Sequence, residues 1–299
     1  MRPLWRLLRE AVSAWSDDYA PSMGAALAYY TLFSVAPLLL IVISVAGLVF
    51  GEDAARGEIM EQLQGLIGAD SAKAVEALLQ SVNKPSKGVL GTLAGVVVLI
   101  IGATTVFGEL QDAMDRIWRE KPPPGRGIVT LLRTRLLSLG MVLGIGFLLM
   151  VSLVVSAALA ALGRWWAPWF GPGLLLLADT LNFVVSLVMM TAIFAQIFKW
   201  MPRVKLAWRD VWIGAAITSL LFTVGKTLIG YYIGRSAIAS TFGAAASIVV
   251  LLVWVYYSAQ IFLLGAEFTR AYAVRYGSQR GRMEPAPNQQ ADVPVRPAA

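Results

Sequence analysis

The sequence predicts an all-α integral membrane protein with six transmembrane helices, from its composition and from the distribution of its charges. Hydrophobic residues make up 58% of the 299 residues and charged residues only 14%, whereas soluble domains are about a quarter charged. Asp, Glu, Lys and Arg are absent from residues 19–51, 88–108, 136–163 and 236–266. About 20 residues of helix cross the hydrocarbon layer, so these stretches indicate membrane spans.

Cysteine and histidine are both absent from the chain. Their absence excludes disulfides, thiolate chemistry, Cys/His zinc sites and acid–base catalysis by imidazole. We therefore expect no metal, no cofactor and no enzymatic activity.

Residues 1–18 predict an amphipathic helix. Leu4, Leu8 and Val12 fall on one side of the helix, with Ala11 and Trp15, and the opposite side carries Arg2, Arg6 and Arg9. Such a helix suits either the headgroup layer of an anionic leaflet or a cytoplasmic surface of the bundle. Because the charges run on to Asp18 and no A-x-A site follows, we do not expect a cleavable signal.

The membrane domain is predicted to cover residues 19–276, and its first span covers about 31–50. A turn of small residues at 22–30 precedes this span. Pro37 lies inside it and cannot donate a backbone hydrogen bond, so a kink or break of the helix is predicted near Ser34.

Residues 51–88 predict two short amphipathic helices in the first external loop. Apolar residues recur there at helical spacing on both sides of Gly68, and Asp70 or Ser71 can cap the second helix. Both helices are too polar to span a membrane.

The remaining spans are predicted at about 89–108, 136–162, 173–198, 211–232 and 243–265. A basic loop with three consecutive prolines at 122–124 separates the second span from the third. Residues 277–299, rich in Pro, Gln and Arg, lack apolar periodicity and predict a disordered cytoplasmic tail.

The distribution of basic residues predicts the orientation. With both termini in the cytoplasm, eighteen of the 25 Lys and Arg residues lie inside and six outside, and Lys226 lies within a span. The positive-inside rule therefore favours six spans with both termini in the cytoplasm. The same asymmetry accounts for the net charge of +7, and nucleic acid is not an expected partner.

Two charged residues within predicted spans are candidates for a substrate pathway, because ionisable groups in the bilayer are costly. Asp179 and Lys226 each lie six residues from the outer end of a span, so they are predicted to lie at equal depth. Asn182 and Ser186 continue the face of Asp179, whereas Ser219 and Thr223 precede Lys226 on its own face.

These two faces suggest a polar cavity in which Lys226 attracts an anionic group. An ion pair that only fixes packing, or a Lys226 side chain that extends to the interface, explains the same pattern.

Glu109 and Glu267 each close a predicted span at the cytoplasmic boundary, with Arg116, Arg119 and Arg270 nearby in the sequence. Glu–Arg pairs at this boundary suggest a cytoplasmic gate formed by Glu109, Arg116 and Glu267. Carboxylates that are merely neutralised by neighbouring arginines are the structural alternative.

Three groups of residues resemble the YihY/virulence factor BrkB family, over about residues 10–275. Residues 25–34, AALAYYTLFS, followed by Ala36-Pro37-Leu38, resemble the family's first-span signature, and residues 107–118, FGELQDAMDRIW, resemble its segment after the second span. The C-terminal region of the family is matched by residues 240–244, 254–256 and 264–267. Asp115 stands where the family usually has Asn, and Phe242 where Tyr is common.

The resemblance implies a bacterial inner-membrane protein with suggested roles in envelope export, serum resistance or lipid-linked translocation. The family was once labelled as a tRNA-processing ribonuclease. The absence of His and Cys and of a sizeable cytoplasmic domain argues against that activity.

The sequence as a whole favours a transporter, exporter or flippase for an anionic or amphipathic envelope-related molecule. The expected partners are the lipid bilayer and a small-molecule or lipid-linked substrate, and a homo-oligomer stays open. A membrane scaffold or assembly factor that transports nothing is the alternative, and a membrane-embedded enzyme is the least favoured class.

Overall fold

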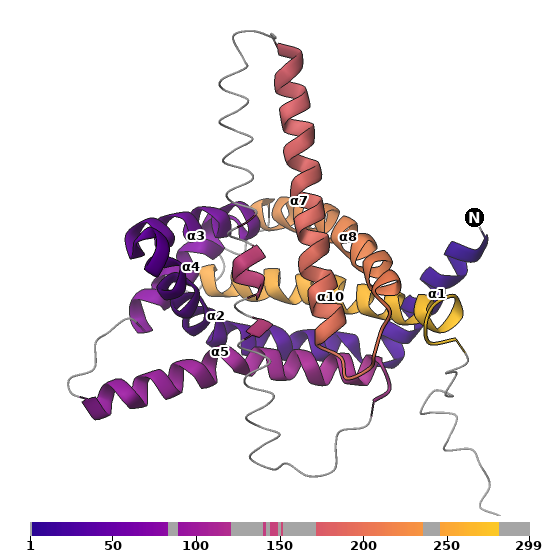
Figure 1. The fold of residues 1–299 in the computed structure, drawn as a ribbon, viewed down its shortest axis with the longest axis horizontal. Coiled ribbons are helices and arrows are strands. Elements are labelled where there is room, and N and C mark those ends of the chain that lie inside the picture. Colours follow the sequence, from indigo (N-terminus) through magenta and orange to yellow (C-terminus); the bar gives the residue numbers. More distant parts are fainter. Residues whose placement is uncertain are drawn as a thin grey trace, which may run out of the picture.

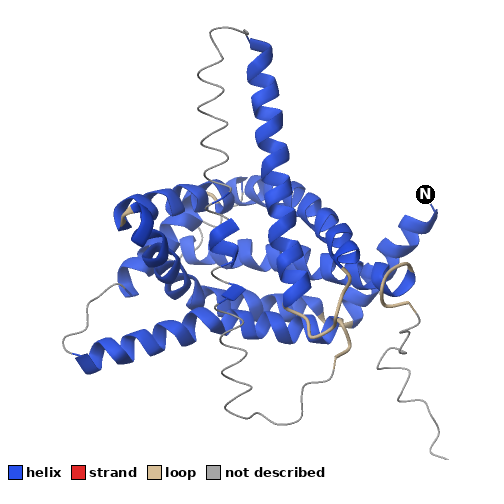
Figure 2. Cartoon of the chain, viewed as in Figure 1, coloured by secondary structure: helices blue, strands red, loops and turns tan. Residues whose placement is uncertain are grey.

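The computed structural model describes residues 2–82, 89–120, 140–141, 144–148, 151, 172–235 and 246–280. All secondary-structure elements within these ranges are helices (Figure 2). They are α1 (Arg2–Asp17), α2 (Ala20–Phe50), α3 (Glu52–Ile67), α4 (Ala69–Val82), α5 (Val89–Ile117), α7 (Pro172–Trp200), α8 (Trp208–Arg235) and α10 (Ala246–Arg275).

Four of these helices contain segments long and apolar enough to cross a membrane, at Ala20–Leu48, Thr180–Trp200, Trp208–Ile233 and Ile248–Arg275. These segments correspond to the first, fourth, fifth and sixth predicted spans. The second predicted span lies in α5, where most side chains before Ile101 are outside the described residues, as is most of the third span at 136–162. The total of six spans and the orientation therefore stay predictions.

The predicted break at Pro37 does not occur, because α2 continues without interruption from Ala20 to Phe50. The alternative, a kink near Ser34, stays a prediction. Pro37 has no N–H for the Phe33 carbonyl four residues earlier. Gly102 of α5 lies against this point, since a Cβ there would be 3.0 Å from Pro37 Cγ and 3.9 Å from the Phe33 oxygen. Neighbouring helices commonly accommodate a proline inside a membrane helix in this way.

The two short helices predicted after the first span are confirmed as α3 and α4. They meet at Gly68, whose φ of 82° is accessible to glycine at little cost. Val75 and Leu79 of α4 pack with Ile43 of α2 and Leu251 of α10 in one buried apolar cluster.

The amphipathic N-terminal helix is confirmed as α1, and it packs on the bundle. Leu7 and Ala11 are buried against Phe268 of α10. Glu10 forms an ion pair with Arg275 near the end of α10. Leu8 and Val12, two members of the predicted apolar side, are exposed. The helix therefore presents a second apolar surface away from α10.

The interior between α7, α8 and α10 is filled by aromatic side chains. Phe194 and Phe222 have ring centroids 5.6 Å apart, and those of Phe198 and Phe262 are 5.2 Å apart. Trp254 continues the cluster against Phe222. This part of the core is apolar and closely packed.

The segments that the sequence assigns to the cytoplasm gather at one end of the bundle. α1 lies beside the C-terminal part of α10, whereas α3 and α4 lie towards the opposite end of α10 (Figure 1). Ion pairs at the first end join the α1–α2 junction to residue 119, and α5 to the segment between α7 and α8. This common end is the place where the chain gathers its buried charges.

Candidate functional site: a buried charge cluster

The first member of the cluster is Asp18, in the two-residue junction between α1 and α2. Its side chain is 3% exposed, and Tyr19 beside it has a φ of 58°. The left-handed region costs a non-glycine residue about 1–2 kcal/mol. At this junction Asp18 is buried in the bundle.

Arg119, just past the end of α5, is the partner of Asp18. One guanidinium nitrogen, Nη1, lies 2.6 Å from Asp18 Oδ1. Arg119 also has a φ of 58°. Tyr19 and Arg119 are the non-glycine residues with positive φ in the described part of the chain. Such backbone strain persists where the surrounding structure holds it, often at functional sites.

Glu267 and Arg270 of α10 complete the cluster, one helical turn apart. Glu267 is 1% exposed, so its carboxyl group is almost entirely removed from solvent. It interacts electrostatically with Asp18, Arg119 and Arg270, and its carboxyl lies within hydrogen-bonding reach of the Asp18 carboxyl. We call Asp18, Arg119, Glu267 and Arg270 the charge cluster.

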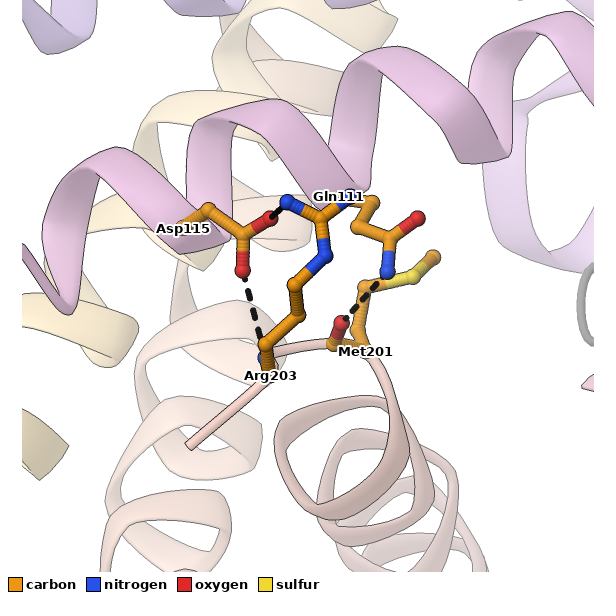
Figure 3. Close-up of polar contacts among 4 residues, drawn as sticks. All are labelled: Gln111, Asp115, Met201 and Arg203. Carbon is orange, nitrogen blue, oxygen red and sulfur yellow. Dashed lines mark hydrogen bonds and ion pairs between the residues drawn. The ribbon is translucent and has the colours of Figure 1, made fainter. Parts of the chain in front are cut away.

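A second buried ion pair lies beside the charge cluster, on the same segment of chain as Arg119. Asp115 of α5 accepts a hydrogen bond of 3.2 Å from the Arg203 backbone N–H, and its Oδ2 lies 2.6 Å from Arg203 Nη1 (Figure 3). Gln111, one turn earlier, donates to the Met201 carbonyl (Figure 3). Burial raises the pKa of Asp115, and the hydrogen bond and charge of Arg203 act in the opposite direction.

Polar contacts also fasten the end of α10 to the start of α8. Asp210 is 3% exposed and accepts a hydrogen bond of 2.7 Å from the Ser278 backbone N–H. The Ser278 hydroxyl accepts a bond from the Ala207 N–H, and Gln279 donates to the Lys205 carbonyl. This end of the bundle is therefore closed by charged and polar contacts between four segments that are distant in the sequence.

One of the three predicted gate residues lies in the cluster. This residue is Glu267, one of the two buried carboxyl groups of the cluster. Glu109 is half-buried on α5 and interacts electrostatically with Asp112 and Arg116 of the same helix. Arg116 is exposed. The Glu109 and Arg116 pair thus stays on the side of α5, apart from the charge cluster.

The predicted pathway residues are spread over two environments. Ser219 is buried, and its hydroxyl lies 2.7 Å from that of Thr191 on α7. Thr223 and Lys226 are partly exposed on α8, whereas Asn182 and Ser186 are exposed on α7. These described side chains do not form one buried polar face.

The predicted pair of Asp179 and Lys226 stays untested. Asp179 lies on α7, but its side chain is outside the described side chains. The N-terminal part of α7 projects away from the other labelled helices (Figure 1).

Sequence reasoning missed Asp18, Asp115 and Arg203 as site residues. Asp18 stands at the edge of the first uncharged stretch, and Asp115 lies in the segment that carries the family resemblance. These positions were available signals. The pairing of Asp18 with residue 119, and of Asp115 with residue 203, has no signature in sequence spacing.

The helices and their polar end define a multi-pass α-helical membrane protein whose one end is closed by buried ion pairs. The chain belongs to the family described as Virulence factor BrkB, whose model matches residues 11–290. The resemblance inferred from the sequence is therefore confirmed.

Curated relatives are named as UPF0761 membrane proteins, and these names contain no enzymatic activity. One, from Pseudomonas aeruginosa, is 31% identical over 83% of this chain and 58% of its own length. Others, from Azotobacter vinelandii and Tolumonas auensis, are each 30% identical, over 95% and 84% of this chain and over 65% and 80% of their own lengths. The chain thus spans only 58% of the Pseudomonas relative. No solved structure matches the chain.

Proposed function

We propose that this protein is a carrier of the bacterial inner membrane, an exporter or flippase for an anionic or amphipathic envelope-related molecule. Both termini face the cytoplasm in this proposal, and the charge cluster forms the cytoplasmic gate. The observation that carries it is the almost complete burial of Glu267 beside Asp18 and two arginines.

The energetics of buried charges support a gate. Replacing a buried ion pair by apolar residues is often neutral or stabilising, so such pairs are weak devices for stability alone. Polar contacts between rigid helices can instead be exchanged for contacts with water or substrate when the helices move. Asp18, Arg119, Glu267 and Arg203 come from segments that would separate if this end opened.

The chemistry of the cluster also suits an anionic substrate. Arg119 forms an ion pair with Asp18, and Arg270 lies beside the acidic groups of the cluster. An entering phosphate or carboxylate could replace those carboxylates as the partner of an arginine. Lys226 on α8 and the polar residues of α7 remain the proposed further pathway, with Asp179 among them.

The second candidate is a membrane scaffold or assembly factor that transports nothing. The aromatic packing of Phe194, Phe198, Phe222 and Phe262 favours it, because this part of the interior is apolar. In that case the charge cluster fixes the packing of α1 and α10.

A translocation assay in vesicles tests the carrier. The full chain is reconstituted into phosphatidylcholine vesicles that carry a fluorescent phosphatidylglycerol in the inner leaflet, and its appearance in the outer leaflet is followed with an impermeant quencher. We expect translocation several-fold faster than in protein-free vesicles. Arg119→Gln should raise the rate further because it weakens the gate.

The matched control is Arg209→Gln, an exposed arginine at the start of α8. It should translocate at the wild-type rate. If wild type and protein-free vesicles are equal, for zwitterionic and anionic lipids and for a water-soluble organic anion loaded inside, the scaffold is the better description.

A further inference from the structure

Three of the four carboxyl oxygens of Asp18 and Glu267 have no hydrogen-bond donor among the described residues, although buried carboxylates require donors. Asp18 Oδ1 is paired with Arg119, but the buried Oδ2 atom has no donor among the described residues. Both buried carboxyl oxygens of Glu267 likewise have no hydrogen-bond donor among the described residues. A buried ionised carboxylate without donors is strongly disfavoured relative to the neutral acid.

One proton bound between the two carboxyl groups would supply a missing donor. The carboxyls of Asp18 and Glu267 lie within hydrogen-bonding reach of each other, and two ionised carboxylates at that distance repel. If one group carries a proton, its O–H donates to the other, and the repulsion becomes a hydrogen bond. Shared protons between paired carboxyl groups are a general result of this geometry.

The surrounding charges decide which group holds the proton. Arg119, from the end of α5, contacts Asp18 at 2.6 Å and stabilises its ionised form. Glu267 faces Asp18 from α10, and among the described residues Arg119 and Arg270 are the basic groups that act on it. Because Arg119 is paired with Asp18, Glu267 is the better placed of the two carboxyl groups to hold a proton.

We propose that Asp18 and Glu267 form a proton-binding site, in which Glu267 donates its proton in a hydrogen bond to ionised Asp18, and that release of this proton opens the charge-cluster end of the protein. On release, the Glu267 O–H bond breaks and the proton passes to water. Ionised Glu267 then competes with Asp18 for Arg119, so the junction of α1 and α2 separates from α10.

The opening step rests on the proposed gate, and it makes the proton the coupling ion of the carrier. The proton site itself does not depend on transport. The two claims therefore need separate measurements.

Infrared titration tests the proton site. The full chain in phosphatidylcholine nanodiscs is titrated between pH 5 and pH 9 while the carbonyl band of protonated carboxylic acids is recorded. We expect wild type to retain such a band at neutral pH and Glu267→Gln to lose it. Asp18→Asn, which removes the neighbouring negative charge, should shift the titration of the band to lower pH. The exposed control Glu61→Gln should match wild type.

The proton site is overturned if wild type lacks the band at neutral pH, or if the band survives in Glu267→Gln. If Glu267→Gln cannot be purified, Asp18→Asn is the test. A band that titrates in Asp18→Asn at the same pH as in wild type also overturns the proton site. A proton site in a protein that moves no lipid or anion leaves this inference standing and removes the carrier.

Cysteine labelling tests the opening. The chain has no cysteine, so Ala20→Cys, at a position 0% exposed beside the junction, reports access to this end. Ser16→Cys, exposed on α1, corrects for the reactivity of the thiol at each pH.

We expect the labelling of Ala20→Cys relative to Ser16→Cys to rise several-fold from pH 6 to pH 9. The ratio should stay flat when Glu267→Gln is added. A ratio that is flat in both backgrounds, or that rises equally in both, overturns the opening step.

Discussion

Single residues at the charge-cluster end are held in costly states. Tyr19 and Arg119 adopt left-handed backbone conformations, and Asp18, Asp115 and Glu267 are buried carboxyl groups. These strained backbone conformations and buried carboxyl groups all lie at the same end of the molecule, where the ion pairs of Asp18 and Asp115 also lie. This coincidence indicates that the end is built for defined contacts between segments, since apolar side chains would stabilise it at lower cost.

Removing Arg203 from its ion pair with Asp115 should destabilise the protein. Arg203→Gln leaves the buried Asp115 carboxylate without its counter-charge, so we expect a loss of about 1–3 kcal/mol in the free energy of unfolding. Adding Asp115→Asn should restore part of the loss, because the stranded charge is then absent. Thermal unfolding of the purified protein in detergent measures both effects. Arg209→Gln is the control, with no change expected.

The same variants have a definite pH dependence. Burial raises the pKa of Asp115 in the folded protein, so its contribution to stability falls as the pH rises through the interval above its ordinary value. Arg203→Gln removes an influence that lowers this pKa, and the interval then extends to higher pH. The loss of stability in Arg203→Gln should therefore grow as the pH rises above the ordinary pKa of an aspartate. An equal loss at all pH values would contradict this account of Asp115.

At the scale of elements, the contact between α8 and α10 depends on two reciprocal glycine–threonine pairs. A Cβ at Gly214 of α8 would overlap the Thr269 side chain of α10, and one at Gly265 of α10 would overlap Thr218 of α8. Thr218 and Thr269 are both fully buried and donate to carbonyls of their own helices. Small residues let helix backbones approach closely in this manner.

This contact predicts different effects for two glycines of the same helix. Gly214→Ala should destabilise the protein by about 1–3 kcal/mol, as overpacking typically does. Gly230→Ala should be neutral or slightly stabilising, because nothing lies within 4 Å of the added Cβ and alanine favours the helix. Thermal unfolding in detergent compares them. Thr269→Ala should recover much of the loss in Gly214→Ala, and equal midpoints for the two single variants would refute the close approach.

The elements also show what sequence patterns can and cannot predict. Apolar periodicity and Gly68 predicted α3 and α4 because both signals are local to the helix. Pro37 does not break α2, and the approach of Gly102 from another helix, which lies against the proline, could not be predicted from the sequence of α2 alone. For α1, periodicity identified the helix, but packing selected Leu7 and Ala11 as its buried contacts with α10.

At the scale of the whole molecule, the candidate site combines residues from opposite ends of the sequence. Asp18, Arg119 and Glu267 are brought together by the packing of α1, α5 and α10, and charge spacing along the chain contains no information on that packing. Glu267 was predicted as a boundary carboxylate, whereas its proximity to Asp18 could not be predicted. The prediction of a substrate pathway had the same limit. Helical spacing identifies which residues share a face with Asp179 or with Lys226 on one helix, but not which residues of another helix that face contacts.

The orientation of the whole molecule gives the last prediction. The basic residues predict that both termini lie inside, and the structure gathers α1, the end of α5, the segment between α7 and α8 and the end of α10 at one end. Because an anionic inner leaflet retains basic segments, single cysteines at this end should be hidden from an impermeant thiol reagent in intact cells. Ser16→Cys and Arg280→Cys should react only after permeabilisation, whereas Glu61→Cys and Gln80→Cys, exposed on α3 and α4, should react without it. The cysteine-free parent provides the background. Labelling of Arg280→Cys in intact cells would place the charge cluster outside, and the proposed cytoplasmic gate would then have the wrong position.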